Sequence, residues 1–393
     1  MRILSTLTFY HPHWTGLTVV ARRLAEGLAG RGHDVTVLTS RHDPRLPRRE
    51  RLVGVRVVRV PTLGRLSRTV VMPTFPVALA REIVRADVVH LHTPMPESPL
   101  IAGVARLLGK PVVVTHHGDV VMPSWGVANR MIQRAMDAMI LAAMRWADRI
   151  VVHTGDYRDH SAFLVPVAGK TDAIYPPVLL PRPRRPEIDR WRRELALEGR
   201  RLVGFAGRFV EEKGFDFLLR AMPIVRERMP ETRFVFAGQL DVPYERFAER
   251  CRSLLDPQLD SITQLGLIGD PQRMADFYGM CDAFVLPSRT DCFAIVQVEA
   301  LLSGTPLVTS DIPGAREVVR ATRAGTLVRV GDPSSLAAGI VRVLEDPERY
   351  LPDPDVVSNV FDPARSISEY EALIHGVVDA RSARSTSRSE ERP

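Results

Sequence analysis

Short runs of β-branched residues alternate with segments of helical periodicity along most of this chain, and this alternation constrains its fold more than any other feature. Apolar residues recur at Val20, Leu24 and Leu28, the spacing of one helix face. Helices are expected over Leu17–Ala29 and Ala128–Ala147. Strands are expected at Ile3–Thr8, Val35–Thr39, Val53–Val60, Val88–His92, Val112–Thr115 and Ile150–His153. Strands that alternate with helices predict a parallel, doubly wound sheet in an α/β fold.

The alternation restarts after a break rich in proline and arginine, so we expect two domains from the 393 residues. The expected organisation is an N-terminal domain over 1–170, a linker over 171–200, a second domain over 201–360, a closing helix over 361–379 and a disordered tail over 380–393. The predicted architecture is two Rossmann-like, doubly wound parallel-sheet domains that face a cleft. Open α/β sheets bind ligands outside the carboxyl ends of their strands.

Charge is distributed unevenly between the two halves. Residues 1–170 contain 23 basic and 12 acidic side chains, a net charge of +11, whereas the remainder has a net charge of −4. A basic first half suits an anionic partner such as a membrane surface. The sequence contains no apolar run long enough to span a membrane, and because its first strand begins at once no signal peptide is expected. Three cysteines without a pairing pattern are consistent with a reducing cytoplasm.

A diphosphate-binding segment is predicted where the strand at Leu202–Ala206 ends. Gly207 and Arg208 follow this strand, and Lys213-Gly214 stands just before the next helix. Glycines let the backbone approach a phosphate, and a helix N-terminus favours negative charge. Arg208 can pair with a phosphate in bidentate fashion and Lys213 can add a point charge. The alternative is that both are solvated cations, with Lys213 paired to Glu211 or Glu212.

Two carboxylates flank a second strand-to-helix turn. Asp291 precedes the turn and Glu299 lies in the following helix. The backbone N–H groups of Phe293, Ala294 and Ile295 would then lie at the start of that helix and face phosphates. Glu299 could accept hydrogen bonds from ribose hydroxyls, and Asp291 could contact a sugar. The alternative is a helix-capping Asp291 and a surface Glu299.

These segments resemble glycosyltransferase family 4, the retaining sugar-nucleotide transferases with the GT-B fold. The resemblance extends over residues 1–345, and its motifs are specific in combination. In the first half it is carried by Gly16, Gly32-His33-Asp34-Val35-Thr36-Val37-Leu38-Thr39 and His117-Gly118. In the second half it is carried by Gly207-Arg208, Lys213-Gly214, Pro287-Ser288, Phe293, Glu299-Ala300, Gly304, Pro306 and Pro313-Gly314.

The resemblance implies a role for each matching residue. Arg208 and Lys213 would contact the diphosphate and Glu299 the ribose, while His117 would lie beside the sugar. Together with Asp291, the residues His117, Arg208 and Lys213 form the predicted catalytic set. The predicted donor-binding residues are Gly16, Gly207, Arg208, Lys213, Gly238, Leu265, Ile268, Phe293, Ala294, Ile295 and Glu299. The nucleobase would lie against the backbone around Leu265–Ile268.

Three positions depart from the family pattern. Asp291 stands where the family usually has Glu, and the first loop reads Thr15-Gly16 instead of a glycine pair. Ala294 replaces the usual glycine, which is tolerable if its φ angle is negative. None of these changes removes a charge that the reaction needs.

The chain is therefore predicted to be a retaining, metal-independent glycosyltransferase that uses a nucleoside-diphosphate sugar and no cofactor. His117 could be a general base, but we favour a role in holding the sugar while the donor's own phosphate oxygen takes the acceptor proton. A buried structural histidine is the remaining alternative. A zinc site among the histidines of the first half is not expected, because they lie at separate strand ends and no helical HxxxH occurs.

The predicted acceptor is a lipid-linked saccharide or a cell-envelope glycan. Loop arginines and nearby apolar segments suggest contact with the inner face of an anionic membrane. The arginines are Arg41, Arg45, Arg48, Arg49, Arg51, Arg65 and Arg68, and the apolar segments are 72–75, 122–125 and the helix that contains Met131, Ile132, Met136 and Ile140. No nucleic-acid motif occurs. An inactive homologue that serves as a partner subunit and a GT-B sugar-nucleotide epimerase remain alternatives, whereas an oxidoreductase would need a GxGxxG that the first half lacks.

Overall fold

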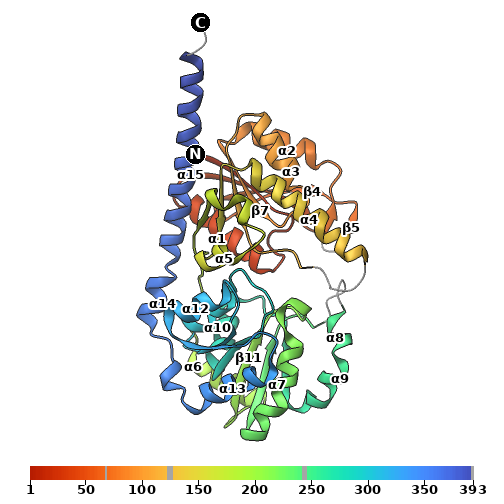
Figure 1. Ribbon diagram of the computed structural model, residues 1–393, viewed down its shortest axis with the longest axis vertical. Helices are drawn as coiled ribbons and strands as arrows, with labels where there is room; N and C mark the ends of the chain where they lie inside the picture. The colour runs from red at the N-terminus through yellow and green to blue at the C-terminus, as the bar shows by residue number, and fades with distance from the viewer. Residues whose placement is uncertain (67–68, 122–126, 241–245, 391–393) are drawn as a thin grey trace. The chain divides into compact units, whose positions relative to one another are not determined.

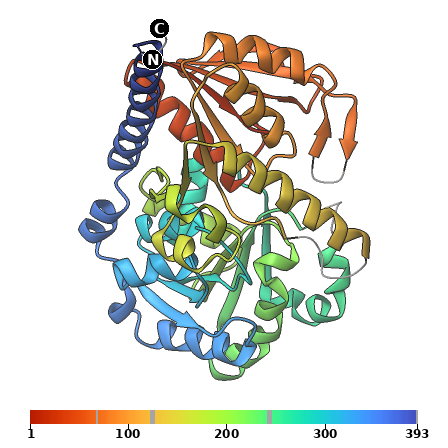
Figure 2. The ribbon, with the colours of Figure 1, turned by 45° about the horizontal axis from the view of Figure 1, so that its top comes forward.

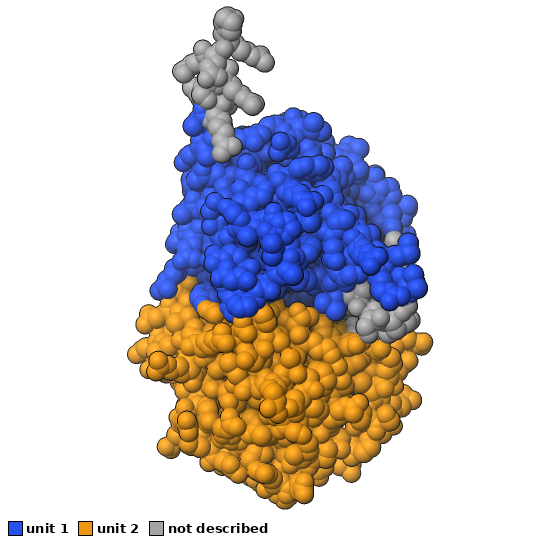
Figure 3. Space-filling model, in the orientation of Figure 1, with its two compact units in different colours: residues 1–177, 363–393 blue, residues 178–362 orange. Residues whose placement is uncertain are grey.

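The chain forms two compact units, coloured separately in Figure 3. Unit 1 comprises Met1–Pro177 together with Pro363–Pro393, and unit 2 comprises Val178–Asp362. The computed structural model describes residues 1–66, 69–121, 127–240 and 246–390. Both units are built on parallel sheets with helices packed against them (Figure 1). Among the described residues, no helix is long and apolar enough to cross a membrane.

Unit 1 contains an eight-stranded sheet in the order β10-β9-β8-β7-β1-β2-β4-β3. All neighbouring strands are parallel except β3 and β4. The strands are β1 Arg2–Thr6, β2 Asp34–Arg41, β3 Arg49–Leu52, β4 Val55–Pro61, β7 Val88–Thr93, β8 Val112–His116, β9 Arg149–Val152 and β10 Thr171–Ala173, and a separate ribbon pairs β5 Gly64–Leu66 with β6 Thr69–Val71. The strand expected at Val53–Val60 is β4, which begins two residues later because Val53 and Gly54 both take positive φ angles and turn the chain from β3 into β4.

The helices of unit 1 include the C-terminal helix α15, which returns to the N-terminal half of the chain. They are α1 Gly16–Gly30, α2 Phe75–Arg85, α3 Ser98–Leu107, α4 Val127–Trp146, α5 Gly155–His160, the 3₁₀ helix η1 Val165–Lys170 and α15 Pro363–Glu390. Figure 2 shows α15 beside the N-terminal elements, and its Tyr370 and Ile374 are buried in the same core as Leu24 of α1. Helix α15 covers the expected closing helix and continues through most of the residues that were expected to be a disordered tail.

Unit 2 contains a six-stranded parallel sheet in the order β13-β12-β11-β14-β15-β16. Its strands are β11 Arg201–Ala206, β12 Thr232–Ala237, β13 Ile262–Gly266, β14 Ala283–Leu286, β15 Leu307–Ser310 and β16 Gly325–Val328. Its helices are α6 Arg185–Glu194, η2 Glu211–Lys213, α7 Phe215–Arg228, α8 Phe247–Arg250, α9 Arg252–Leu255, η3 Asp256–Ser261, α10 Pro271–Met280, α11 Ile295–Leu302, α12 Ala315–Thr322, α13 Pro333–Glu345, η4 Glu348–Tyr350 and α14 Pro354–Val360.

The segment expected to be a linker is divided between the two units. Residues 171–173 form β10 at the edge of the first sheet, and α6 belongs to unit 2. Pro186 does not break structure, because proline is favoured in the first turn of a helix and Pro186 stands there in α6. Ile188 and Trp191, one helical turn apart, are buried, and Arg184 pairs with Asp276 of α10. The units therefore separate between Pro177 and Val178 and again between Asp362 and Pro363.

The packing of α15 on α1 generates a stability prediction. A Cβ atom added at Gly27 would overlap the side chain of Ile367, whereas nothing lies within 4 Å of a Cβ at Gly30. We expect Gly27→Leu to lower the free energy of unfolding by about 1–3 kcal/mol through overpacking. The matched change Gly30→Leu should stay within about 0.5–1 kcal/mol of the wild type. Urea unfolding measures both, and equal effects would contradict the close packing of the two helices.

Candidate functional site

The strand order of the unit 2 sheet reverses between β11 and β14. Numbered in chain order from β11, its strands lie in the order 3-2-1-4-5-6. Successive strands are therefore added toward one edge of the sheet up to β13 and toward the other edge from β14 on. In open α/β sheets the ligand site lies at this switch point, outside the carboxyl ends of the strands. Residues 207–214 follow β11, and residues 287–294 follow β14. The topology therefore brings the two segments singled out from the sequence to one edge of the sheet.

Aromatic packing anchors the 207–214 loop to the core. Phe209 within the loop and Phe215 just after it are both fully buried, with ring centroids 3.9 Å apart. Phe205 of β11 and Phe236 of β12 complete this cluster. A loop tied to the core at both ends holds its backbone in place, which is what recognition of a fixed anion requires.

Two glycines are required where backbones cross at this edge. Gly214 has a φ angle of 65°, and a Cβ atom there would overlap the carbonyl oxygen of Pro287. Gly238 has a φ angle of 143°, and a Cβ atom there would overlap the carbonyl oxygen of Gly207. Gly238, predicted to bind the donor, thus allows the segments after β12 and β11 to pack closely.

Lys213 and Asp291 join the two loops directly. The Lys213 Nζ atom donates to Asp291 Oδ2 at 2.6 Å, and the two side chains are 23% and 10% exposed. Burial by itself would lower the pKa of Lys213, but the carboxylates of Asp291 and Glu212 outweigh it, and the pKa is raised. Arg208 contacts Glu212 at 3.2 Å. Lys213 is therefore paired with Asp291 across the two loops, and not with Glu211 or Glu212 as in the alternative.

Arg289 braces the same two loops and was not found by sequence reasoning. Its backbone N–H donates to the Glu212 carbonyl at 2.8 Å, and its Nη1 atom donates to the Glu211 carbonyl at 2.7 Å. Its guanidinium also holds Asp216 through two bonds of 2.8 Å and lies 3.9 Å from the ring centroid of Phe217. The pattern of charges along the sequence carries no signal for this role, because all of these partners are more than 70 residues away.

The second segment leads into α11 as the sequence predicts. Asp291 forms a β-bridge with Gly314, so it is held in place by backbone as well as by Lys213. Ala294 is the N-cap of α11 with a φ angle of −89°, which meets the condition for an alanine at this position. Ala294 has no side-chain acceptor that could cap this helix, so the amides of its first turn keep the orientation that favours an anion. Phe293, by contrast, is buried against Phe361.

Glu299 lies inside the protein and not on its surface. It is 7% exposed, and its Oε2 atom accepts a hydrogen bond from the hydroxyl of buried Tyr278 at 3.1 Å. The alternative of a capping Asp291 with a surface Glu299 is therefore wrong. Leu265, at the end of edge strand β13, and Ile268 just beyond it are half-buried. Of the site residues predicted in unit 2, Lys213 and Asp291 are joined by a direct hydrogen bond.

In unit 1, Gly16 and His117 lie at the carboxyl edge of the sheet. Gly16 is exposed at the start of α1, where Thr15 and Thr18 form a reciprocal capping box. His117 follows β8, and its backbone N–H donates to the Thr93 carbonyl at 2.9 Å. Its Nε2 atom lies 2.9 Å from His92 Nδ1, and its Nδ1 atom lies 3.0 Å from His153 Nε2. Both ring nitrogens are thus engaged by protein groups.

Burial disfavours the charged form of these histidines. Burial, followed by the neighbouring histidines, lowers the pKa of His117 and of His92 well below the ordinary value. Burial lowers the pKa of His153 and of His90 to about 4. An imidazole with this pKa and two occupied nitrogens is a poor general base.

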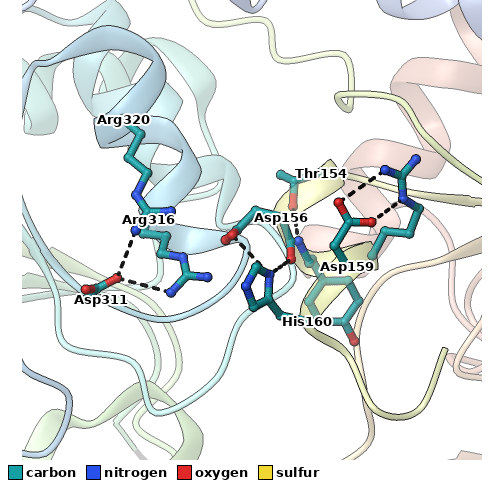
Figure 4. Close-up of polar contacts among 9 residues, drawn as sticks. Thr154, Asp156, Asp159, His160, Asp311, Arg316 and Arg320 are labelled. Atoms are coloured by element: carbon teal, nitrogen blue, oxygen red, sulfur yellow. Dashed lines mark hydrogen bonds and ion pairs between the residues drawn. The ribbon is translucent and has the colours of Figure 1, made fainter. Parts of the chain in front are cut away.

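Other charged groups near strand ends are paired within their own unit (Figure 4). In unit 1, Thr154 caps α5 by accepting from the Tyr157 N–H at 3.0 Å, and His160 pairs with Asp156. In unit 2, Asp311 after β15 contacts Arg316 and Arg320 of α12. These contacts fix the ends of short helices and leave the predicted site residues uninvolved.

One cluster within the described residues has the composition of a metal site: His33, Glu371 and His375. Glu371 already accepts from His33 Nε2 at 2.7 Å and from Arg31 at 2.7 Å. Arg31 also donates to the carbonyl of Ala364 and to Ser368. A guanidinium on the carboxylate opposes binding of a cation, so this cluster serves to fasten α15 to the loop between α1 and β2.

Chemically, the edge of unit 2 offers cations for an anion and buried carboxylates for hydroxyls. Arg208, Lys213 and the starts of α7 and α11 favour phosphate groups. Asp291 and Glu299 are acceptors for hydroxyl donors. The combination suits a ligand that carries both a diphosphate and sugars.

Comparisons with known proteins match both halves of the chain. The family described as Glycosyltransferase Family 4 matches residues 14–180, and the one described as Glycosyl transferases group 1 matches residues 200–346. D-inositol 3-phosphate glycosyltransferase 1 of Catenulispora acidiphila is 31% identical over 361 residues, which cover 85% of this chain and 83% of that protein. Phosphatidyl-myo-inositol mannosyltransferase of Mycobacterium leprae is 28% identical and covers 84% of each chain.

Among solved structures, Anabaena HepE in complex with UDP and glucose superposes with a TM-score of 0.75. The superposition covers 96% of this chain and 100% of that one at 18% sequence identity, so it concerns the fold.

The buried histidines generate a prediction about acid stability. Between pH 6.5 and about 4 the unfolded chain binds protons at histidines that stay neutral when folded. The contribution of these histidines to the free energy of unfolding is therefore complete above pH 6.5 and is lost as the pH falls below it. A pKa of about 4 at His90 corresponds to roughly 3 kcal/mol over this window. We expect His90→Gln to make the fall shallower by about that amount in urea unfolding at several pH values. His160→Gln, at an exposed histidine, is the control, and identical pH slopes in all three proteins would contradict the assignment.

Proposed function

This chain belongs to glycosyltransferase family 4, and we propose that it transfers a sugar from a nucleoside-diphosphate sugar to a hydroxyl acceptor with retention of configuration. That it is a glycosyltransferase, with the two parallel-sheet α/β domains of the predicted GT-B fold, follows from the family and from the topology. The donor and the stereochemical course are the proposal. The observation that carries it is the Lys213–Asp291 pair at the switch point of the unit 2 sheet.

Lys213 and Arg208 are proposed to neutralise the diphosphate. The raised pKa of Lys213 keeps its ammonium charged, so it can stabilise the negative charge that grows on the leaving diphosphate. The first turn of α11, which carries no acidic residue, and the start of α7, where Asp216 is paired with Arg289, would add partial positive charge. Because the chain supplies these charges itself, we propose that transfer proceeds without a metal. The complex of HepE with UDP and glucose supports a nucleotide-sugar donor.

Asp291 and Glu299 are proposed to bind hydroxyl groups, the former on the sugar and the latter on the ribose. Asp291 is one methylene shorter than the usual glutamate, yet it reaches Lys213 at 2.6 Å. Asp291 therefore still forms the charge pair with Lys213 in spite of its shorter side chain. An inactive homologue would not need this pair. When the donor binds, the phosphate and Asp291 share Lys213, which leaves the second Asp291 oxygen for a sugar hydroxyl.

Retention is proposed to occur with the donor's own phosphate oxygen as the base. His117 is unsuited to accept the acceptor proton, because both of its ring nitrogens are engaged and its pKa is low. In this mechanism the acceptor hydroxyl attacks as the bond from the sugar to the phosphate breaks, and its proton passes to the departing phosphate. His117 then contributes position and polarity.

The proposed acceptor is an anionic lipid-linked saccharide or a cell-envelope glycan, reached at the inner face of a membrane. Two relatives are named for inositol phosphate and phosphatidylinositol substrates, and the three cysteines are free thiols, as a reducing cytoplasm favours. On α4, the exposed apolar residues Val127, Met131 and Ile132 lie beside exposed Arg130 and Arg134, a composition typical of interfacial helices.

Some of the apolar residues that were predicted to face the membrane are not exposed. Met72, in the segment between β6 and α2, Phe75 of α2 and Ile140 of α4 are buried in the core. Residues 122–125 and Arg68 lie outside the described residues. Arg48 and Arg49 are exposed and have no ion pair among the described residues, so they remain candidates for contact with lipid phosphates.

Binding and turnover test the donor assignment. We expect one class among UDP-, GDP- and ADP-sugars to raise the unfolding midpoint in the presence of EDTA, because a ligand at about 100 times its Kd adds roughly 2.7 kcal/mol. Arg208→Ala and Lys213→Ala should each cost about 2–4 kcal/mol in kcat/KM. Arg220→Ala, at an exposed cation of α7, is the matched control.

Wild-type turnover in both site variants would overturn the diphosphate assignment. A shift of the midpoint without any transfer would favour the inactive partner subunit. Nucleotide release without an added acceptor would favour the epimerase. The anomeric configuration of the product, read by NMR, decides retention.

The membrane assignment is tested by flotation with vesicles of anionic lipid. Replacing Arg45, Arg48, Arg49 and Arg51 by glutamine should weaken binding by about tenfold or more, because each basic residue at the surface contributes about 1 kcal/mol. Raising the salt concentration should have the same effect on the wild type. The control replaces four exposed arginines of unit 2, Arg182, Arg185, Arg193 and Arg200. Equal loss in both quadruple variants would show that only net charge matters.

A further inference from the structure

Three neighbouring strands of unit 1 each deliver one histidine to the same edge of the sheet. His92 lies near the end of β7, His117 directly follows β8 and His153 directly follows β9. The parallel register pairs His92 with Thr115 and Thr115 with Val151, so the carboxyl ends of the three strands coincide. The three rings form a continuous chain, with centroids 5.2 Å and 4.8 Å apart. We call this chain the histidine row.

The two ring contacts of His117 constrain each other. A neutral imidazole donates from one ring nitrogen and accepts at the other. Because His117 is bonded through Nε2 to His92 and through Nδ1 to His153, the two hydrogen bonds must run in the same direction along the histidine row. The row therefore confines the His117 proton to one ring nitrogen.

We propose that His92 and His153 are positioning residues, which hold the imidazole of His117 in one orientation and in one tautomer. This inference rests on the function proposed above, in which His117 lies beside the transferred sugar. A ring bonded on both sides cannot turn, and the residue's backbone N–H is also fixed to Thr93. The histidine row thereby presents the sugar with a neutral, immobile group whose backbone carbonyl keeps a fixed position.

Immobility matters because misplacement of a group by about 1 Å can cost up to about 100-fold in rate. Freed from the histidine row, the ring of His117 could rotate or exchange its proton between the two nitrogens, and part of the population would then present the wrong group. Donor binding, which depends on the charges of unit 2, should be little affected. The expected signature is a loss in kcat with a nearly constant KM.

Paired substitutions in the full-length protein separate hydrogen bonding from packing. His153→Gln keeps a hydrogen-bonding amide near the place of Nε2, whereas His153→Leu removes it at similar volume. His92→Asn keeps a hydrogen-bonding amide near the place of Nδ1, whereas His92→Leu removes it. His90→Gln is the packing control, since the His90 ring lies 4.2 Å from that of His92 while its hydrogen bond goes to Thr115 at 2.7 Å.

We expect the two leucine variants to lose about 10- to 100-fold in kcat, with KM for the donor changed by less than about threefold. The glutamine and asparagine variants should recover most of this loss, and His90→Gln should match the wild type. Long-range ¹⁵N–¹H NMR should show the His117 proton confined to one ring nitrogen in the wild type and distributed over both nitrogens in the leucine variants. Unfolding midpoints verify that each variant is folded, and the amide variants carry the test if a leucine variant is not.

Folded leucine variants with wild-type kcat, or with the His117 proton still confined to one ring nitrogen, would overturn the proposal. The NMR measurement needs no substrate, so it separates this proposal from the proposed function. If the wild type transfers no sugar but the proton redistributes as expected, the positioning role stands and the assignment of the reaction falls. If transfer occurs and the ring is unchanged in every variant, the positioning role alone falls.

Discussion

The contact between the loops that follow β11 and β14 is the interaction on which the candidate site depends. Gly214 lets one backbone approach the carbonyl of Pro287 on the other, and the Lys213–Asp291 pair adds a charged bond of 2.6 Å between them. Arg289 holds the same loops from the other side through two carbonyls and Asp216. Without this contact, the cations and carboxylates that suit a sugar nucleotide would lie on two independent loops.

A buried charge pair of this kind is costly to separate. Removing one partner of such a pair typically costs about 3–5 kcal/mol, because the other charge stays buried without compensation. A ligand diphosphate can avoid that cost, since it brings its own negative charge to Lys213. The pair thus keeps the lysine charged and in place until an anion arrives, which is the preorganisation that electrostatic stabilisation requires.

The two units differ in the electrostatics of the residues at their strand ends. Unit 2 places charged groups at the edge of its sheet and compensates them in pairs. Unit 1 buries several histidines there and keeps them neutral through desolvation, with hydrogen bonds from ring to ring. Binding of an anionic leaving group needs the first arrangement. A group that must stay fixed without taking a proton needs the second.

The sequence by itself determined the α/β class, the two domains and the residues of both strand-end segments, because strand–helix alternation and glycine spacing are local properties of the chain. It also set a condition on Ala294 that the structure meets, with a φ angle of −89°. The domain boundaries predicted from the sequence were less accurate. The proline composition suggested a linker where β10 and α6 form, because a proline at the start of a helix, such as Pro186, looks in the sequence like one that ends a helix. Only the tertiary structure decided that Lys213 pairs with Asp291, 78 residues away, that Arg289 braces both loops and that His92, His117 and His153 form one row. These contacts depend on strand order and register, which are set by the packing of the whole sheet and leave no periodic trace in the residues that they join.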